Sequence, residues 1–289
     1  MALPLGGVTP LGTDRGIRVP RGRRVLRTLE GADGGKFFLQ IPVGWSPGGP
    51  VLIAIHGISR EARQQIDLFA AHAALHRCAL IAPWFRDDDY AGFQRLGLDG
   101  RGGRADRFLL RILAAFDELF ECATPAFARF LFGYSGGAQF AHRFALLHPG
   151  HCAALVLGAA GWYSFPDPAI AWPRGLAAWP GDRQPDLAAW LRLPMLVLVG
   201  RRDTERDEVL RTGRALNRQQ GRHRLERARR FVGAVNAAAD AAGCVAPARL
   251  EVLPGVGHSF IDAVTLGGLA ERTFSFLGFR APVVSGESP

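Results

Sequence analysis

The chain has 289 residues, of which 48% are apolar and 21% charged, and this balance excludes an intrinsically disordered protein. Its net charge of +9 would suit a nucleic acid or an anionic membrane surface. Arginine supplies nearly all of the positive charge, because Lys36 is the only lysine. The densest basic run, Arg211–Arg230, has no aromatic residues that could stack on bases. We therefore expect no nucleic-acid binding and interpret this run as a solvated helix face, with an anion site as the alternative.

Signals for membranes, export and metals are missing from the sequence. No run of about 18 apolar residues occurs, so we expect no membrane span. The first 24 residues have no charged start followed by an apolar core, which predicts a cytoplasmic protein without a secretion signal. The four cysteines show no C-x-x-C spacing, so neither a zinc site nor a disulfide framework is expected. The oligomeric state is left open.

Strand-length apolar runs alternate with helical patterns along the chain. This alternation predicts an α/β fold with a mostly parallel sheet and helices on both faces. The first two strands, with a glycine-rich turn between them, are expected to form an antiparallel hairpin. The predicted strands are 24–29, 36–41, 51–55, 78–82, 127–132, 153–157, 195–199 and 249–253. The predicted helices are 62–76, 104–120, 135–147, most of 207–242, and 261–277, and 84–103 is expected to be a loop.

One segment, about 161–192, interrupts this rhythm and holds four of the six tryptophans. Long segments without secondary structure in a compact domain are usually functional, so we expect a small cap over the sheet. Its aromatic residues Trp162, Phe165 and Trp172 are predicted to line an apolar substrate pocket. The alternative is a surface excursion whose tryptophans only pack on the body. The whole organisation is then a flexible leader (1–23), one domain (24–280) and a flexible tail (281–289).

The strongest chemical signal is the sequence Gly133-Tyr134-Ser135-Gly136-Gly137. An apolar strand leads into it and a helix rich in small residues follows, as in a nucleophile elbow. Such a turn strains the central residue, and the flanking glycines relieve the crowding. Ser135 is therefore the predicted nucleophile. The alternative is a glycine-rich helix start with a capping serine.

A serine nucleophile needs a base and a carboxylate that orients the base. His258 lies just beyond the last strand, where the loop reaches the carboxyl edge of the sheet, so we predict that it is the base. Asp203 follows the strand 195–199 and is the favoured acid, with Asp207 as the second choice. A helix cap is the alternative role for Asp203.

An oxyanion hole needs two N–H donors aimed at the developing alkoxide. Gly136 follows the nucleophile and is expected to supply one. The loop after the first central strand, His56-Gly57-Ile58, is expected to supply the other from Ile58. His56 is then a structural residue of that loop.

These motifs, together with Gly200-Arg201-Arg202-Asp203 and Gly257-His258, resemble the α/β-hydrolase superfamily in order and spacing. The resemblance covers about Leu26 to Leu277. The segment Lys36-Phe37-Phe38-Leu39-Gln40-Ile41-Pro42 is similar to the polyhydroxybutyrate-depolymerase and feruloyl-esterase branch. The resemblance implies hydrolysis of a small-molecule ester through an acyl-enzyme, with no metal or organic cofactor.

Two other classes of function remain open. The same triad serves thioesterases, amidases and acyltransferases, and the fold alone does not choose among them. A binding protein that kept the fold without catalysis is the alternative from outside the enzymes.

Overall fold

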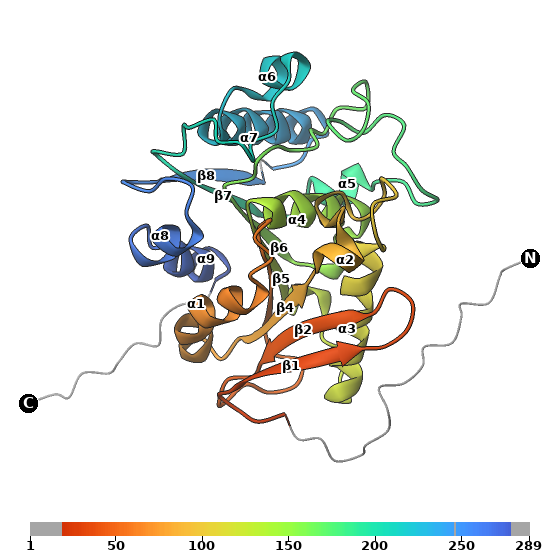
Figure 1. The fold of residues 1–289 in the computed structure, drawn as a ribbon, viewed down its shortest axis with the longest axis vertical. Helices are drawn as coiled ribbons and strands as arrows, with labels where there is room; N and C mark the ends of the chain where they lie inside the picture. The colour runs from red at the N-terminus through yellow and green to blue at the C-terminus, as the bar shows by residue number, and fades with distance from the viewer. Residues whose placement is uncertain (1–18, 246, 279–289) are drawn as a thin grey trace, which may run out of the picture.

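The computed structural model describes residues 19–245 and 247–278, and an eight-stranded sheet runs through this part of the chain (Figure 1). The strand order is β1-β2-β4-β3-β5-β6-β7-β8. The first three strands in this order pair antiparallel, and every later pair is parallel. The strands are β1 (Arg24–Leu29), β2 (Gly35–Gln40), β3 (Val51–Ile55), β4 (Ala79–Trp84), β5 (Arg129–Tyr134), β6 (Ala154–Gly158), β7 (Met195–Gly200) and β8 (Ala248–Leu253).

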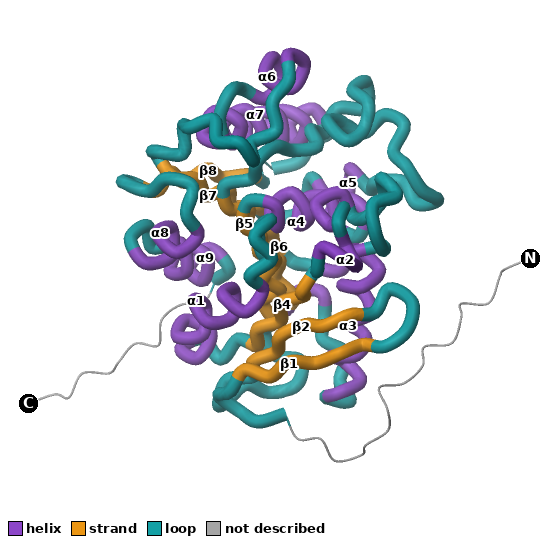
Figure 2. Tube along the Cα trace, viewed as in Figure 1, coloured by secondary structure: helices purple, strands orange, loops and turns teal. Residues whose placement is uncertain are grey.

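Helices cover both faces of the sheet (Figures 1 and 2). One face carries α1 (Ala62–Leu75), α8 (Phe260–Thr265) and α9 (Leu269–Phe276). The other carries α3 (Ala105–Leu119), α4 (Gly136–Leu147) and α7 (Arg224–Ala241). The short helices are α2 (Asp87–Tyr90), α5 (Leu187–Trp190) and α6 (Arg214–Gln220), with 3₁₀ turns η1 (Phe93–Arg95), η2 (Ala126–Ala128) and η3 (Pro149–His151).

Because helices cover both faces of the sheet, the central strands are apolar at every position. Every residue of β3, β6 and β7 is buried. In β3, Leu52 and Ala54 pack in the cluster under α1 and α9, whereas Ile53 and Ile55 pack in the cluster under α3 and α4. A strand buried on both faces has no side for polar residues. The predicted α/β-hydrolase architecture, a mostly parallel sheet between two helical layers, is confirmed.

Several predicted element boundaries were wrong. β4 continues through Pro83 to Trp84, because it pairs with β2 over these residues, and its parallel ladder with β3 already ends at Ile81. Residues 84–103 contain α2 and η1 as well as loop. The helical region expected from 207 begins only at Arg214. The last predicted helix is two helices, because Gly268 adopts a left-handed φ of 63° between α8 and α9.

The predicted leader, tail and cap differ in how far the structure describes them. Most of the leader (1–18) and the whole tail (281–289) lie outside the described residues. Arg21 and Gly22, which were expected in the leader, bond to the body through Ile41 and Trp45. Between β6 and α5, the segment expected to form a cap has only an isolated bridge, Ala171 to Ala177.

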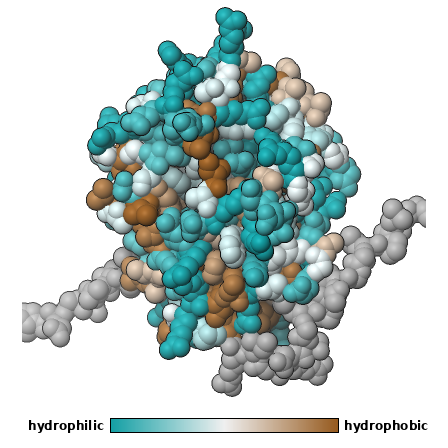
Figure 3. Space-filling view, viewed as in Figure 1, coloured by the Kyte–Doolittle hydropathy of each residue, from teal (hydrophilic) through white to brown (hydrophobic). Residues whose placement is uncertain are grey.

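The visible face of the molecule is mostly hydrophilic, with small, separate hydrophobic patches (Figure 3). In the part of the chain that the structure describes, no helix has the length and apolar character needed to cross a bilayer.

The turn from β5 into α4 brings two backbone segments unusually close together. A Cβ on Gly137 would lie 2.1 Å from the carbonyl oxygen of Ile55 and 2.6 Å from that of His56. A Cβ on Gly133 would lie 2.2 Å from the carbonyl oxygen of Gly137. No side chain fits at these distances, so glycine is required for α4 to start this close to β3.

We predict that Gly137→Ala lowers the free energy of unfolding by about 3 kcal/mol or more, because rigid backbone must move. Gly233→Ala is the matched control: Gly233 lies in α7 with nothing within 4 Å of an added Cβ. There the same change should stabilise by about 0.5–1 kcal/mol. Urea unfolding measures both values, and equal effects at the two positions would contradict this account.

Candidate active site

The predicted site residues come from the carboxyl ends of four parallel strands. Ser135 directly follows β5, Ile58 follows β3, Asp203 follows β7 and His258 follows β8. In an open α/β sheet the carboxyl ends of the strands share one edge, and ligands bind there. The sheet topology therefore collects residues separated by up to 200 positions.

Ser135 occupies a strained backbone position. Its φ is 51° and its ψ is −110°, a region that non-glycine residues rarely enter. Its N–H donates to the carbonyl of Gly158 at 2.7 Å, and its own carbonyl accepts from the Gln139 N–H at 3.2 Å. These two bonds fix the turn between β5 and α4. The hydroxyl is left partly exposed at the N-terminal end of α4.

The structure brings Ser135, His258 and Asp203 into one hydrogen-bonded chain. The Ser135 Oγ lies 3.1 Å from His258 Nε2, and His258 Nδ1 lies 2.8 Å from Asp203 Oδ2. With Nδ1 protonated and donating to the carboxylate, Nε2 is free to accept the serine proton. Tyr134 stacks on the imidazole of His258 at 5.7 Å between ring centroids and shields one side of it. Burial raises the pKa of Tyr134, so its phenol is neutral.

The two candidate acids have different partners. Asp203 is buried and contacts His258, whereas Asp207 binds Arg224 through two bonds of 2.7 and 3.0 Å. The Arg224 guanidinium holds the pKa of Asp207 below its usual value. Asp207 lies in the loop before α6 and not in a helix as expected. The geometry therefore favours Asp203 as the carboxylate that orients the base.

Arg224 links both acids, and the sequence analysis gave it no individual role. Its Nη1 also lies 3.5 Å from Asp203 Oδ1, the carboxylate oxygen that does not face His258. The prediction of a solvated arginine face is wrong for Arg224 and Arg227, which are buried, although Arg222, Arg229 and Arg230 are exposed. The three-residue spacing of Arg224 and Arg227 puts both on one face of α7. This spacing could have indicated from the sequence that the two arginines share a face, but it does not tell whether that face is buried.

The loop after β3 lies against the nucleophile. A Cβ on Gly57 would be 3.7 Å from the Ser135 Cβ, and one on Gly136 would be 3.2 Å from the Ile58 nitrogen. Neither the Ile58 N–H nor the Gly136 N–H donates to an acceptor within residues 19–245 and 247–278. Two free N–H groups thus lie side by side next to the serine, which suits the binding of an oxyanion.

His56 is a buried part of this loop. Its Nδ1 lies 2.7 Å from the Gly57 carbonyl oxygen, and its Nε2 accepts from the Phe85 N–H at 3.0 Å. Burial lowers the pKa of His56 to about 4, so the ring is neutral at pH 7. His56 therefore connects the loop after β3 to the segment after β4.

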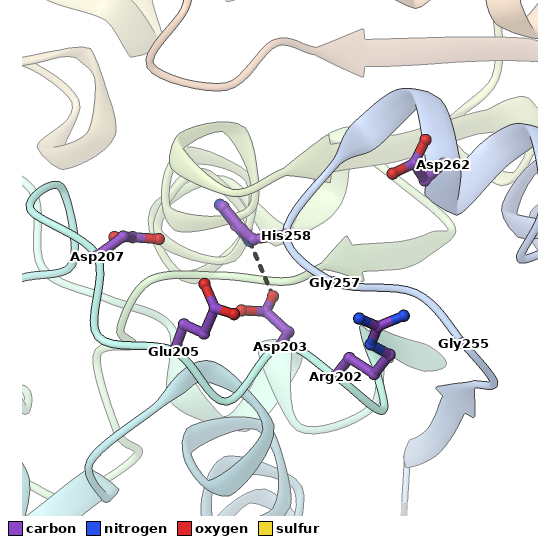
Figure 4. Close-up of a pocket in the computed structure, with 8 residues that line it drawn as sticks. All are labelled: Arg202, Asp203, Glu205, Asp207, Gly255, Gly257, His258 and Asp262. Atoms are coloured by element: carbon purple, nitrogen blue, oxygen red, sulfur yellow. Dashed lines mark hydrogen bonds and ion pairs between the residues drawn. The ribbon is translucent and has the colours of Figure 1, made fainter.

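A cavity of about 230 Å³ opens on the acid side of the triad (Figure 4). His258 and Asp203 meet at its centre, and Figure 4 shows Glu205 and Asp207 on one side of them with Arg202 and Asp262 on the other. Its lining is polar, so this cavity does not match the apolar pocket that was expected from the cap.

The three aromatic residues predicted to bind substrate pack mainly against protein. Trp162 is 4% exposed, and the guanidiniums of Arg143 and Arg211 lie 4.4 and 5.0 Å from its ring. Phe165 packs on Phe231, and Trp172 packs edge-on against Trp179. None of the three lines the cavity in Figure 4. Their role in binding substrate stays a prediction.

Comparison with solved structures finds the same fold along almost the whole chain. Poly(3-hydroxybutyrate) depolymerase LpqC from Bordetella parapertussis aligns over 91% of this chain and 92% of its own, with 28% identity and a TM-score of 0.74. The 289-residue chain therefore has the α/β-hydrolase fold. Poly(aspartic acid) hydrolase-1 from Sphingomonas sp. KT-1 aligns over 89% and 98%, with 22% identity and a TM-score of 0.74.

An S-formylglutathione hydrolase from Agrobacterium tumefaciens aligns less closely, over 89% and 95% of the two chains with 14% identity and a TM-score of 0.59. No protein-family model and no curated protein sequence matches the chain. The expected resemblance to α/β-hydrolases, and within them to the polyhydroxybutyrate-depolymerase and esterase branch, is confirmed.

The two acids can be distinguished by mutation. We predict that Asp203→Asn lowers kcat for ester hydrolysis by about 10⁴-fold, because the amide no longer holds His258 in the required tautomer. Asp207→Asn should have a far smaller effect, because its carboxylate faces Arg224. Steady-state kinetics of both variants tests this, and a larger loss in the Asp207 variant would contradict the assignment.

Proposed function

We propose that this protein hydrolyses carboxylic esters through an acyl-enzyme formed on Ser135. The observation that carries the proposal is the chain of contacts from Ser135 Oγ to His258 Nε2 and from His258 Nδ1 to Asp203, at the carboxyl edge of the sheet. The spacing of 3.1 Å between Oγ and Nε2 allows direct proton transfer. The same three residue types in the same chain order serve many hydrolases of this fold.

The reaction follows from these contacts. Ser135 Oγ attacks the ester carbonyl carbon while His258 Nε2 takes its proton. The Ile58 and Gly136 N–H groups bind the negative oxygen of the tetrahedral intermediate. His258 then donates the proton to the leaving alcohol, and the acyl group remains on Ser135. Water attacks the acyl-enzyme, again with His258 as the base, and releases the acid.

An ester is supported by the neighbour described above with 28% identity, whereas the poly(aspartic acid) hydrolase and the S-formylglutathione hydrolase share the fold at lower identity and act on an amide and a thioester. The neighbour with 28% identity is a polyester depolymerase, and a ferulic acid esterase also shares the fold. Two exposed apolar side chains, Ile58 in the loop after β3 and Ile261 in the first turn of α8, would suit an uncharged acyl or alcohol group. We therefore propose a moderately hydrophobic ester as substrate. The cytoplasmic location expected from the sequence stays a prediction.

Hydrolysis of p-nitrophenyl butyrate tests the proposal. We expect a burst of p-nitrophenol equal to the amount of enzyme, followed by slower turnover, because p-nitrophenol leaves readily and acylation is then faster than hydrolysis of the acyl-enzyme. Ser135→Ala should lower kcat by at least about 10⁴-fold, since no nucleophile remains. Ser275→Ala, an exposed serine on α9, is the matched control and should keep full activity.

Matched ester, thioester and amide substrates with one acyl group then separate the chemistries that share this triad. The ester should give the highest kcat/KM. A higher kcat/KM for the thioester or the amide would replace ester hydrolysis as the function. A folded native protein that hydrolyses none of them would favour the binding-protein alternative.

A further inference from the structure

A polar side chain from the segment after β4 lies next to the two backbone N–H groups of the proposed oxyanion site. A Cβ on Gly136 would lie 3.2 Å from Gln94 Nε2 and, equally, 3.2 Å from the Ile58 nitrogen. Gln94 belongs to η1, far from both in sequence. Its side-chain amide is half-buried and has no hydrogen-bond partner within the described residues. A side-chain N–H₂ group without a partner therefore lies beside Gly136, as far from the Cβ position of Gly136 as the Ile58 nitrogen is.

The backbone on both sides of this amide is held firmly. Phe93, the preceding residue, is buried against His56 at 5.1 Å between ring centroids. The Gln94 carbonyl accepts from Arg143 Nη1 at 2.7 Å. Arg60, two residues after Ile58, donates to the carbonyls of Phe85 and Tyr90 and contacts the Phe93 ring at 5.1 Å. These contacts tie η1 to the loop after β3, so Gln94 and Ile58 keep a fixed relation.

A buried arginine, Arg143, holds the backbone of Gln94 in place. It is fully buried in α4 and forms no ion pair within the described residues, although the Asp99 carboxylate is near enough to favour its charge. Its guanidinium binds the carbonyls of Gln94 and Gln139 and the Ser164 hydroxyl. Burying a cation with only neutral partners is costly. In return, the hydrogen bonds of Arg143 hold η1 against α4, the helix that begins directly after Ser135.

We infer that Gln94 is a catalytic residue whose Nε2 donates a third hydrogen bond to the oxyanion. The inference rests on the proposed function, since it needs an oxyanion at this place. Two backbone N–H groups leave one lone-pair direction of the alkoxide for a further donor. A preorganised side-chain amide in such a hole stabilises the transition state more than the substrate, because charge on the oxygen develops during attack.

The closing experiment compares Gln94→Met and Gln94→Glu with the native protein on p-nitrophenyl butyrate. Methionine keeps the length of the side chain but donates nothing. We expect kcat to fall about 100-fold with KM nearly unchanged, the pattern of an interaction made in the transition state. Gln64→Met on α1 is the matched control and should keep native kcat. Circular dichroism confirms that each variant folds.

Two readouts separate oxyanion binding from a structural role. The Ki of a trifluoromethyl ketone, whose oxyanion occupies the same hole, should rise in proportion to the loss of kcat/KM. Activity of Gln94→Glu relative to native should rise as the pH falls from 8 to 5, because the protonated carboxyl can donate and the carboxylate repels the oxyanion.

The outcomes are distinguishable. A Gln94→Met variant with native kcat, or with a raised KM and an unchanged Ki, would overturn the role of Gln94 while leaving ester hydrolysis intact. A native protein without any hydrolysis would overturn both.

Discussion

The close approach of α4 to β3 at the turn after β5 is the constraint on which the site depends. Gly133 and Gly137 let the backbone turn from strand to helix within a few residues, where any side chain would meet a carbonyl at 2.1 to 2.2 Å. The strain falls on Ser135, whose φ of 51° is kept by bonds to Gly158 and Gln139. The turn sets the hydroxyl against His258 on one side and the Ile58 loop on the other.

Buried arginines stabilise the loops that carry the other site residues. Arg143 secures η1 and the segment after β6, and Arg227 binds the carbonyls of Gly161, Arg211 and Gly221. Arg224 joins α7 to Asp203 and Asp207. Burial lowers the pKa of Arg227 to about 10, which leaves it charged at neutral pH. Each guanidinium offers five N–H donors, so one side chain can hold several loop carbonyls that lack partners in strands or helices.

Local patterns in the sequence were sufficient for much of this structure. The continuous apolar runs predicted the central strands, and the glycine pattern around Ser135 predicted the turn. Asp203 and His258 could be proposed because each follows a strand that ends at the shared edge. Long-range packing could not be predicted in this way. Burial of Arg224 and Arg227 depends on which face of α7 meets the loops after β7 and β6.

The position of Gln94 at the site likewise could not be predicted from local sequence patterns. It lies in a polar segment with no motif, and only the fold places it beside Gly136 and Ile58. For the cap residues, composition predicted a pocket; Trp162 and Phe165 also pack against neighbouring side chains, and their role in binding substrate stays a prediction. Composition reports which residues prefer to be buried, but not whether a protein core or a ligand buries them.

Activation of the Ser135 nucleophile by His258 is the step on which the proposed reaction depends. Labelling with a fluorophosphonate probe, followed by peptide mapping, tests it most directly, because such probes react with serines that a neighbouring base activates. We expect one label per chain, on the peptide that contains Ser135, and loss of the label in both Ser135→Ala and His258→Ala. A folded native protein that takes up no label, or that carries the label on another residue, would contradict it.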